Sequence, residues 1–187
     1  MLIEKLIVGL YQENCYILVK ENKCMIVDPG DEANKIISKI NDLKLELVGI
    51  LITHAHFDHI GALNDILKKY NVPVYYNNVN KEINCNKLIN VKEEEYVCDL
   101  FKFKVIYTGG HRNDLVTYYF YEDNIMFTGD FLFKKCIGRM DLEYASYLEM
   151  MKSIEKIKKY NDDITIYPGH GEESTLGYEK ENNSYLC

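Results

Sequence analysis

Short apolar runs separated by polar turns fill the first part of the chain. Leu2–Val8, Cys15–Val19 and Cys24–Val27 have the length and composition of strands, and only a few polar residues separate them. The pattern predicts three neighbouring antiparallel strands. Asp28-Pro29-Gly30 is a turn sequence and ends the third of them.

The apolar positions then take the spacing of a helix. Residues 33, 36, 37, 40 and 43 are apolar, which predicts a helix over Ala33–Leu43. The continuous apolar run Val48–Ile52 predicts a strand that is buried on both faces. His59–Tyr70 returns to helical spacing, and Val74–Tyr76 predicts another short strand.

The second half repeats this alternation of strands and helices. Strands are predicted over Leu100–Thr108, Leu115–Tyr121 and Ile125–Thr128. Tyr147–Ile157 carries a helical apolar face, and Ile164–Tyr167 predicts a last strand before a polar tail. Strands followed by helices, twice over, predict an α/β fold of two similar halves, with two sheets packed on each other and helices outside.

Length and charge narrow the class of protein. A chain of 187 residues without a break in composition fits a single domain over residues 1–187. Its 22 basic and 29 acidic side chains give a formal net charge of −7. Such a surface repels phosphate backbones and anionic lipids, so we expect neither a nucleic acid nor a membrane as a partner.

Two further features bear on location. No apolar run approaches the roughly 18 residues of a membrane span, and Glu4 and Lys5 interrupt the apolar start that a signal peptide would need. The six cysteines are scattered without a C-x-x-C pair, which is typical of reduced thiols in a well-packed protein. We therefore expect a cytoplasmic protein, either a monomer or a small homo-oligomer.

Metal-binding side chains cluster directly after the predicted strand Val48–Ile52, in the sequence Thr-His-Ala-His-Phe-Asp-His of residues 53–59. Imidazole nitrogens and carboxylate oxygens are donors that suit zinc and its first-row neighbours. Because side chains repeat with a period of two at a strand end, His54 and His56 point in related directions. Asp58 and His59 return from the following helix, so this one segment can supply two metal ions.

The remaining histidines also follow predicted strands. His111 and His170 each come directly after a turn that contains glycine, and Asp130 ends the sequence Phe-Thr-Gly-Asp after another strand. Four strand ends that each offer a ligand predict one shared metal centre. Such a centre would use all five histidines of the chain.

These motifs resemble the metallo-β-lactamase superfamily and, within it, the glyoxalase II-like (hydroxyacylglutathione hydrolase-like) branch. The resemblance covers nearly all of the chain and implies a four-layer αββα sandwich with the metals at one edge of the two sheets. The segments that carry it are Asn14-Cys15-Tyr16-Ile17-Leu18, Val27-Asp28-Pro29-Gly30, Thr53–Gly61, Phe127–Asp130, Ile137-Gly138-Arg139-Met140-Asp141, Tyr167-Pro168-Gly169-His170-Gly171 and Gly177-Tyr178-Glu179-Lys180.

The resemblance also implies two divalent metal ions, with zinc as the first choice and iron or manganese as the alternatives. The ligands of the first ion would be His54, His56 and His111. The ligands of the second ion would be Asp58, His59 and His170. The carboxylate that bridges the two ions would be Asp130.

The implied reaction is the hydrolysis of a small-molecule thioester, such as S-lactoylglutathione. Two metal ions lower the pKa of a shared water towards ~7 and so supply a hydroxide for attack on the carbonyl. The thiolate that leaves needs little protonation, because a free thiol has a pKa of ~8.5. Asp58, which would orient the hydroxide, and Asp130 are the expected catalytic residues.

The only two arginines are candidates for holding an anionic group of the substrate. Arg112 comes directly after a predicted ligand. Arg139 follows Gly138 in a loop that resembles the basic, glutathione-holding loop of glyoxalase II. Lys134 and Lys135, in the same loop, are interpreted as solvated side chains.

Two departures from the family pattern keep other activities open. After His111 the sequence is Arg-Asn-Asp-Leu, and only 17 residues follow His170, so we expect no counterpart of the helical domain that holds glutathione in glyoxalase II. An iron-dependent persulfide dioxygenase and a lactonase are the alternatives on this fold. The dioxygenases usually have Asp where this chain has Gly171, whereas lactonases share the whole ligand set. A metal-binding module without catalysis is the remaining alternative.

Overall fold

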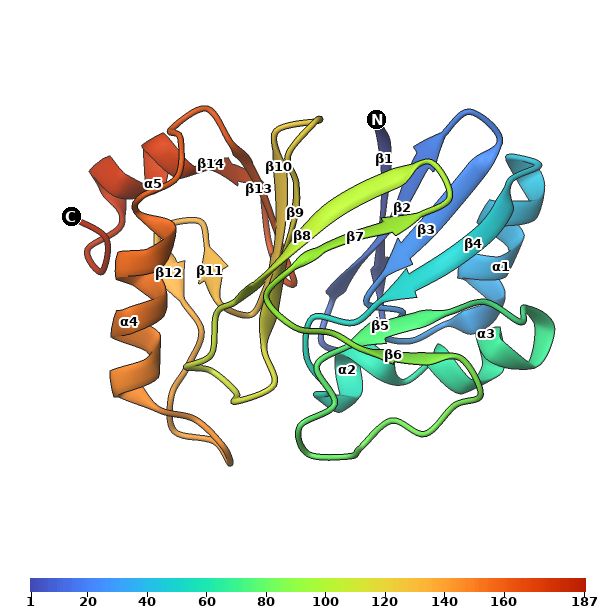
Figure 1. The fold of residues 1–187 in the computed structure, drawn as a ribbon, viewed down its shortest axis with the longest axis horizontal. Helices are drawn as coiled ribbons and strands as arrows, with labels where there is room; N and C mark the ends of the chain where they lie inside the picture. The colour runs from blue at the N-terminus through green and yellow to red at the C-terminus, as the bar shows by residue number, and fades with distance from the viewer.

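Two six-stranded sheets pack face to face in the computed structural model, which describes residues 1–187 (Figure 1). The first sheet contains, in spatial order, β1 (Leu2–Val8), β2 (Glu13–Lys20), β3 (Lys23–Val27), β4 (Glu46–Leu51), β5 (Val74–Tyr76) and β6 (Leu88–Asn90). The second contains β14 (Ser174–Thr175), β13 (Thr165–Pro168), β10 (Ile125–Gly129), β9 (Val116–Phe120), β8 (Phe101–Tyr107) and β7 (Glu95–Cys98).

Five helices and one small hairpin complete the fold. The helices are α1 (Ala33–Asp42), α2 (Phe57–Ile60), α3 (Leu63–Lys69), α4 (Tyr147–Ile157) and α5 (Leu176–Asn182). The hairpin is formed by β11 (Leu132–Phe133) and β12 (Cys136–Ile137). None of the helices has both the length and the apolar character that a membrane crossing requires.

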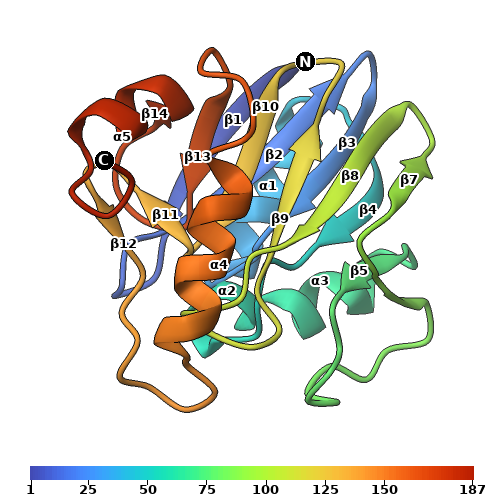
Figure 2. The same ribbon diagram turned by 60° about the vertical axis from the view of Figure 1, so that its left-hand side comes forward.

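The pairing within the first sheet follows from its connections. Tight turns join β1 to β2 and β2 to β3, and these pairs are antiparallel, as the sequence predicts. From β3 to β6 the pairs are parallel, and the connections from β3 to β4 and from β4 to β5 run through helices. In the second sheet only β10 and β13 are parallel, and α4 lies on the connection between them. Figure 2 shows α4 in front of that sheet.

Three apolar clusters fill the spaces between four layers. One joins α1 and α3 to the first sheet and includes Ile36 and Ile66. A second lies between the two sheets and contains many aromatic rings, among them Phe103 and Tyr118. The third joins α4 and α5 to the second sheet and includes Ile154. The helices therefore lie outside and the sheets inside (Figure 1), which confirms the predicted αββα sandwich.

The structure differs from the sequence prediction at two helices. The helix predicted over His59–Tyr70 is divided into α2 and α3, because Gly61 lies against the Gly30 turn: a Cβ on Gly61 would be 2.3 Å from the Gly30 carbonyl oxygen. The amide of Ala62 donates to the carbonyl of Pro29 instead of continuing the helix (N···O 3.0 Å). The polar tail predicted after the last strand contains β14 and α5, whose buried Leu176 packs on the third cluster.

Candidate metal centre

The structure brings the seven predicted ligands together at one edge of the sandwich. His54 and His56 follow β4, and α2 carries Asp58 and His59. The other ligands follow strands of the second sheet: His111 follows β8, Asp130 follows β10 and His170 follows β13. Two groups of donor atoms result, each with all its atoms within 4.8 Å of one another: His54, His56, His111 and Asp130, and Asp58, His59 and His170.

Three imidazole nitrogens converge in the first group. His56 Nδ1 lies 3.1 Å from His54 Nε2 and 2.9 Å from His111 Nε2. Ligands at the ordinary zinc–nitrogen distance on a tetrahedron are roughly 3.3 Å apart, so this spacing fits nitrogens that share one metal ion. The three rings also lie edge to face, so each directs one nitrogen at the same point.

Asp130 lies between the two groups. Its Oδ1 is 3.3 Å from His59 Nε2, and its Oδ2 is 3.7 Å from both His111 Nε2 and His170 Nε2. Asp58 Oδ2 is 3.4 Å from His170 Nε2 and completes the second group. Asp130 is therefore the one side chain that faces both groups, which fits a bridging carboxylate.

The outer nitrogen of four histidines is already engaged by the protein. His59 Nδ1 is 2.9 Å from Asp28 Oδ2, His111 Nδ1 is 2.8 Å from the Arg139 carbonyl, and His170 Nδ1 is 3.1 Å from the Tyr11 carbonyl. His54 Nδ1 lies 3.1 Å from the Thr53 hydroxyl. Because an acceptor at Nδ1 fixes the tautomer, Nε2 of these rings keeps its lone pair for a metal.

Asp28 supports the site from beneath, although its sequence, Asp-Pro-Gly, predicts only a turn. Its Oδ1 accepts from the Thr53 amide (2.7 Å), and its Oδ2 accepts from the Thr53 hydroxyl (2.6 Å) as well as from His59. It is 2% exposed. The position of Asp28 directly after a strand could have indicated this supporting role. Strands β3 and β4 are parallel neighbours, so the residues that follow them meet at the same edge of the sheet.

The residues fit divalent metal ions. His59 Nε2 and Asp130 Oδ1 are buried and lie 3.3 Å apart but form no hydrogen bond with each other or with any other group, although an unpaired buried polar atom costs about 1–3 kcal/mol. Burial lowers the pKa of His56 to about 4, and burial and the neighbouring rings lower the pKa of His54, so both rings are neutral at pH 7 as metal ligands must be.

The carboxylates of the site are ionised. Burial raises the pKa of Asp130, but the charge of His59 outweighs it and the net pKa is lowered. Burial likewise opposes ionisation of Asp58, while its hydrogen bond with His170 lowers the pKa below the ordinary value. Two carboxylates among five imidazoles are a donor set for divalent first-row cations.

Arg112, a predicted substrate contact, lies beneath the histidine loop and is 6% exposed. Its Nε donates to Asp114 Oδ1 (2.8 Å), and its Nη2 pairs with Glu82. The other oxygen of Asp114 accepts from the Ala55 amide (2.9 Å) and the Tyr76 hydroxyl (2.6 Å). Both ends of this guanidinium are therefore engaged, and the network holds the turn between His54 and His56.

Arg139, the other predicted substrate contact, faces solvent. Its guanidinium forms a two-bonded pair with Asp141, with Nε–Oδ1 and Nη2–Oδ2 distances of 2.7 Å each, and both side chains are about two-thirds exposed. The backbone of Arg139 is what contacts the centre, through the carbonyl that accepts from His111. Gly138 permits this approach, since a Cβ there would be 1.9 Å from the Asp130 carbonyl oxygen.

Two neighbouring residues of β2, in the first sheet, lie beside the metal centre, and neither was predicted from the sequence as a site residue. Asn14 donates through Nδ2 to the carbonyls of Pro168 and Gly171, both at 3.0 Å, and so brackets His170. Glu13 is fully buried, neither of its oxygens has a partner, and burial raises its pKa well above the ordinary value.

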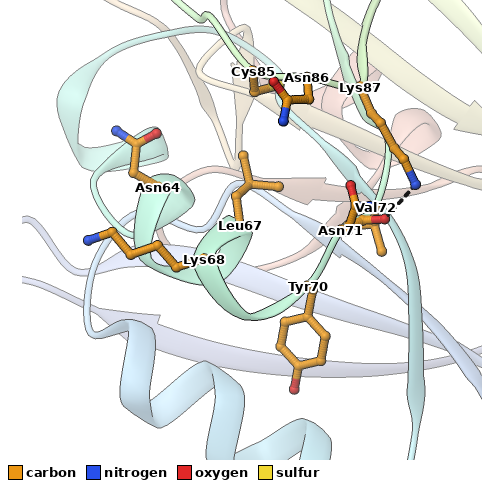
Figure 3. A pocket seen from close by; sticks show the side chains of 9 residues that line it. All are labelled: Asn64, Leu67, Lys68, Tyr70, Asn71, Val72, Cys85, Asn86 and Lys87. Atoms are coloured by element: carbon orange, nitrogen blue, oxygen red, sulfur yellow. Dashed lines mark hydrogen bonds between the residues drawn. The ribbon is translucent and has the colours of Figure 1, made fainter.

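Three hollows of the surface differ in their relation to the centre. One of about 500 Å³ has His170 in its lining, and one of about 300 Å³ has Asp58. A third, of about 520 Å³, lies on the outer side between α3 and the segment before β6, where Lys87 donates to the Asn71 carbonyl (Figure 3). It contains none of the seven ligands, so it is separate from the centre.

Comparisons with known proteins agree with this geometry. A family model described as the metallo-beta-lactamase superfamily matches residues 8–170. The chain is 32% identical to the hydroxyacylglutathione hydrolase GloC of Haemophilus influenzae, over 100% of this chain and 98% of that protein.

Two solved structures superpose over nearly their whole length. The BLEG-1 B3 metallo-beta-lactamase has a TM-score of 0.91 at 29% identity, with 99% of each chain covered. TTHA1623 in a di-iron-bound form has a TM-score of 0.86 at 28% identity, with 98% of this chain and 100% of that chain covered. The match to the family model includes every residue of both donor groups.

Proposed function

The chain belongs to the metallo-β-lactamase superfamily, and from this premise we propose that it is a binuclear metallo-hydrolase that cleaves thioesters of small thiol carriers. Family membership confirms the resemblance that the histidine and glycine motifs predicted. The similarity to a hydroxyacylglutathione hydrolase supports the choice of thioesters.

One observation carries the proposal: no side chain at the centre is left to protonate a leaving group. Asp58 and Asp130 are ionised, since their pKa values lie below the ordinary range. All five histidines belong to the two donor groups. Glu13, whose pKa is raised, is fully buried and has no access to a substrate. Such a centre suits a leaving group that departs as a stable anion, which a thiolate does far more readily than an amide nitrogen or an alkoxide.

Asp58 and Asp130 would have different roles in this reaction. Two divalent ions, when bound, would supply a hydroxide at neutral pH and polarise the substrate carbonyl. The Asp58 side chain is 17% exposed and ionised, so it can accept a hydrogen bond from the attacking water and orient its lone pair towards the carbonyl. Asp130, which faces both donor groups, would keep the two sets of ligands in register.

The test combines activity with metal content. Purified protein is assayed for loss of the thioester bond of S-D-lactoylglutathione, and the same sample is analysed for metals. Hydrolysis with about two metal ions per chain is the expected result. Two bound ions without hydrolysis of a panel of thioesters would contradict the proposal and favour a lactone or another ester. One iron per chain with oxygen consumption on a persulfide would favour the dioxygenase.

A further inference from the structure

We propose that Lys134 and Lys135 form an anion subsite beside the metal centre that holds a carboxylate of the substrate's thiol carrier. This inference rests on the proposed thioesterase function. The subsite is the hollow of about 500 Å³ lined by Phe133, Lys134, Lys135, His170, Glu172 and Tyr178.

The subsite opens directly on the chemistry. His170 lies in its wall, and His170 Nε2 is 3.4 Å from Asp58 and 3.7 Å from the bridging Asp130. The side chain of His170 is 27% exposed, whereas His54, His59 and His111 are buried. A ligand in this hollow is therefore in reach of the second group of donor atoms.

Neither lysine ammonium is held by a strong ion pair within the protein. Lys134 pairs with Glu172 at 2.6 Å, but the two side chains are 40% and 78% exposed, and such surface pairs contribute little. The Lys135 ammonium has no carboxylate partner and lies 5.7 Å from the centre of the Tyr178 ring. With Glu172 as the acidic residue of the same lining, the two lysines leave the hollow with an excess of one positive charge in a chain whose net charge is −7, which favours an anionic substrate.

The backbone of this loop is held in place. Lys135 has a left-handed backbone with φ of 63°, and its amide donates to Glu179 Oε2 at 2.7 Å. Glu179 is fully buried and also accepts from Ser174 and Asn183. A buried carboxylate with three donors fixes the loop, so both lysines are presented without further ordering of the backbone.

The arginines do not compete for this role. Arg112 is buried with two carboxylate partners, and Arg139 is paired twice with Asp141. A substrate anion can therefore bind the two lysines while breaking fewer existing ion pairs than it would at either arginine. Tyr178 adds a flat apolar face against which the carrier's chain can lie.

The experiment compares substrates that differ in charge. The Lys134→Gln/Lys135→Gln double variant is assayed with S-lactoylglutathione, which carries carboxylates on the thiol side, and with S-lactoyl-N-acetylcysteamine, which is neutral. Because two exposed cations are lost together, we expect KM for the charged substrate to rise by about three- to tenfold, with kcat unchanged and KM for the neutral substrate within about twofold. Lys68→Gln is the matched control, because Lys68 also loses an exposed carboxylate partner but lies on α3.

Other outcomes would overturn the inference. Equal changes for both substrates, or none, would remove the lysines from recognition. A succinyl thioester of N-acetylcysteamine carries its carboxylate on the acyl side, and an effect confined to it would place the anion there instead.

If the protein hydrolyses no thioester, the proposed function fails and the subsite is tested separately. Calorimetry with S-methylglutathione, which cannot be hydrolysed, should then give a Kd about fivefold or more weaker for the double variant. An unchanged Kd would overturn the subsite.

Discussion

The His111 ring donates its Nδ1 hydrogen to the backbone carbonyl of Arg139, 2.8 Å away and 28 residues further along the chain. The arginine that the sequence marks as a substrate contact thus reaches the metal centre through its backbone. Its side chain turns to solvent and pairs with Asp141. The loop after Asp130 therefore orients the predicted ligand His111 through its main chain.

We expect Arg139→Gln to leave metal content and kcat unchanged and to alter KM by less than about twofold, because the carbonyl that holds His111 remains and exposed ion pairs contribute little. Steady-state kinetics with a charged thioester provides the measurement. A KM increase of fivefold or more would restore the interpretation of Arg139 as the residue that holds the substrate anion.

Asp28→Asn is expected to weaken binding of the second metal ion by about 10–100-fold, because an amide cannot accept from His59 and Thr53 as the carboxylate does. Elemental analysis after dialysis against a mild chelator should find about one ion per chain instead of two. Asp65→Asn, on the exposed face of α3, is the control and should keep the content of the unaltered protein. Two tightly held ions in Asp28→Asn would exclude this supporting role.

Sequence patterns predicted the elements and ligands whose signal is local. Helix α1 and strand β4 follow from apolar spacing over about ten residues, and His54 and His56 from their position after a strand end. The supporting role of Asp28 was not predicted, because it depends on hydrogen-bond partners 25 and 31 residues away in the sequence.

The same limit applies to the partners of charged side chains and to the point where a helix is interrupted. The partners of Arg112 are Glu82, 30 residues before it, and Asp114, and nothing in the local sequence shows that both carboxylates turn towards it. The helix that the apolar pattern extends from His59 to Tyr70 is interrupted because Gly61 packs on the Gly30 turn. Both outcomes come from tertiary contacts, which apolar periodicity does not report.

Asn14→Ala should destabilise the protein and loosen the His170 turn, because the carbonyls of Pro168 and Gly171 lose a donor. The Pro168 carbonyl keeps its bond from the Tyr16 hydroxyl, so the cost is that of two lost hydrogen bonds, roughly 0.5–1.5 kcal/mol each, and metal content should fall towards one ion per chain. Tyr16→Phe is the matched control, since it removes a bond to the same Pro168 carbonyl but leaves Asn14 in place. Equal loss of metal in both variants would mean that general stability, and not the position of His170, governs metal binding.

Arg112→Met is expected to lower the free energy of unfolding by about 3 kcal/mol, because it leaves the fully buried Asp114 without its cation. Urea denaturation measures this loss. The ratio of KM values for charged and neutral thioesters should stay unchanged, since the guanidinium lies beneath the histidine loop. A change in that ratio without loss of stability would instead support direct contact between Arg112 and the substrate.

The dependence of folding stability on acidic pH tests an interaction that lies away from the predicted metal ligands. Glu93 Oε1 accepts from the Tyr107 amide (2.8 Å) and from Lys156 (2.7 Å), and so ties β8 to α4. Burial alone raises the pKa of Glu93, but these hydrogen bonds outweigh it and lower the pKa below the ordinary value. The stabilisation is therefore complete above the unfolded pKa of ~4.3 and is lost as the pH falls through the lower, folded pKa.

Glu93→Gln should consequently reduce stability at pH 7 and flatten the decline of stability below about pH 5 relative to the unaltered protein. Thermal unfolding from pH 7 down to about pH 3, with a chelator present so that metal release does not contribute, isolates this difference. Glu155→Gln is the control, because Glu155 forms an exposed pair with Lys158 within one turn of α4. Parallel pH profiles for Glu93→Gln and the unaltered protein would show that the tie between β8 and α4 does not depend on the charge of Glu93.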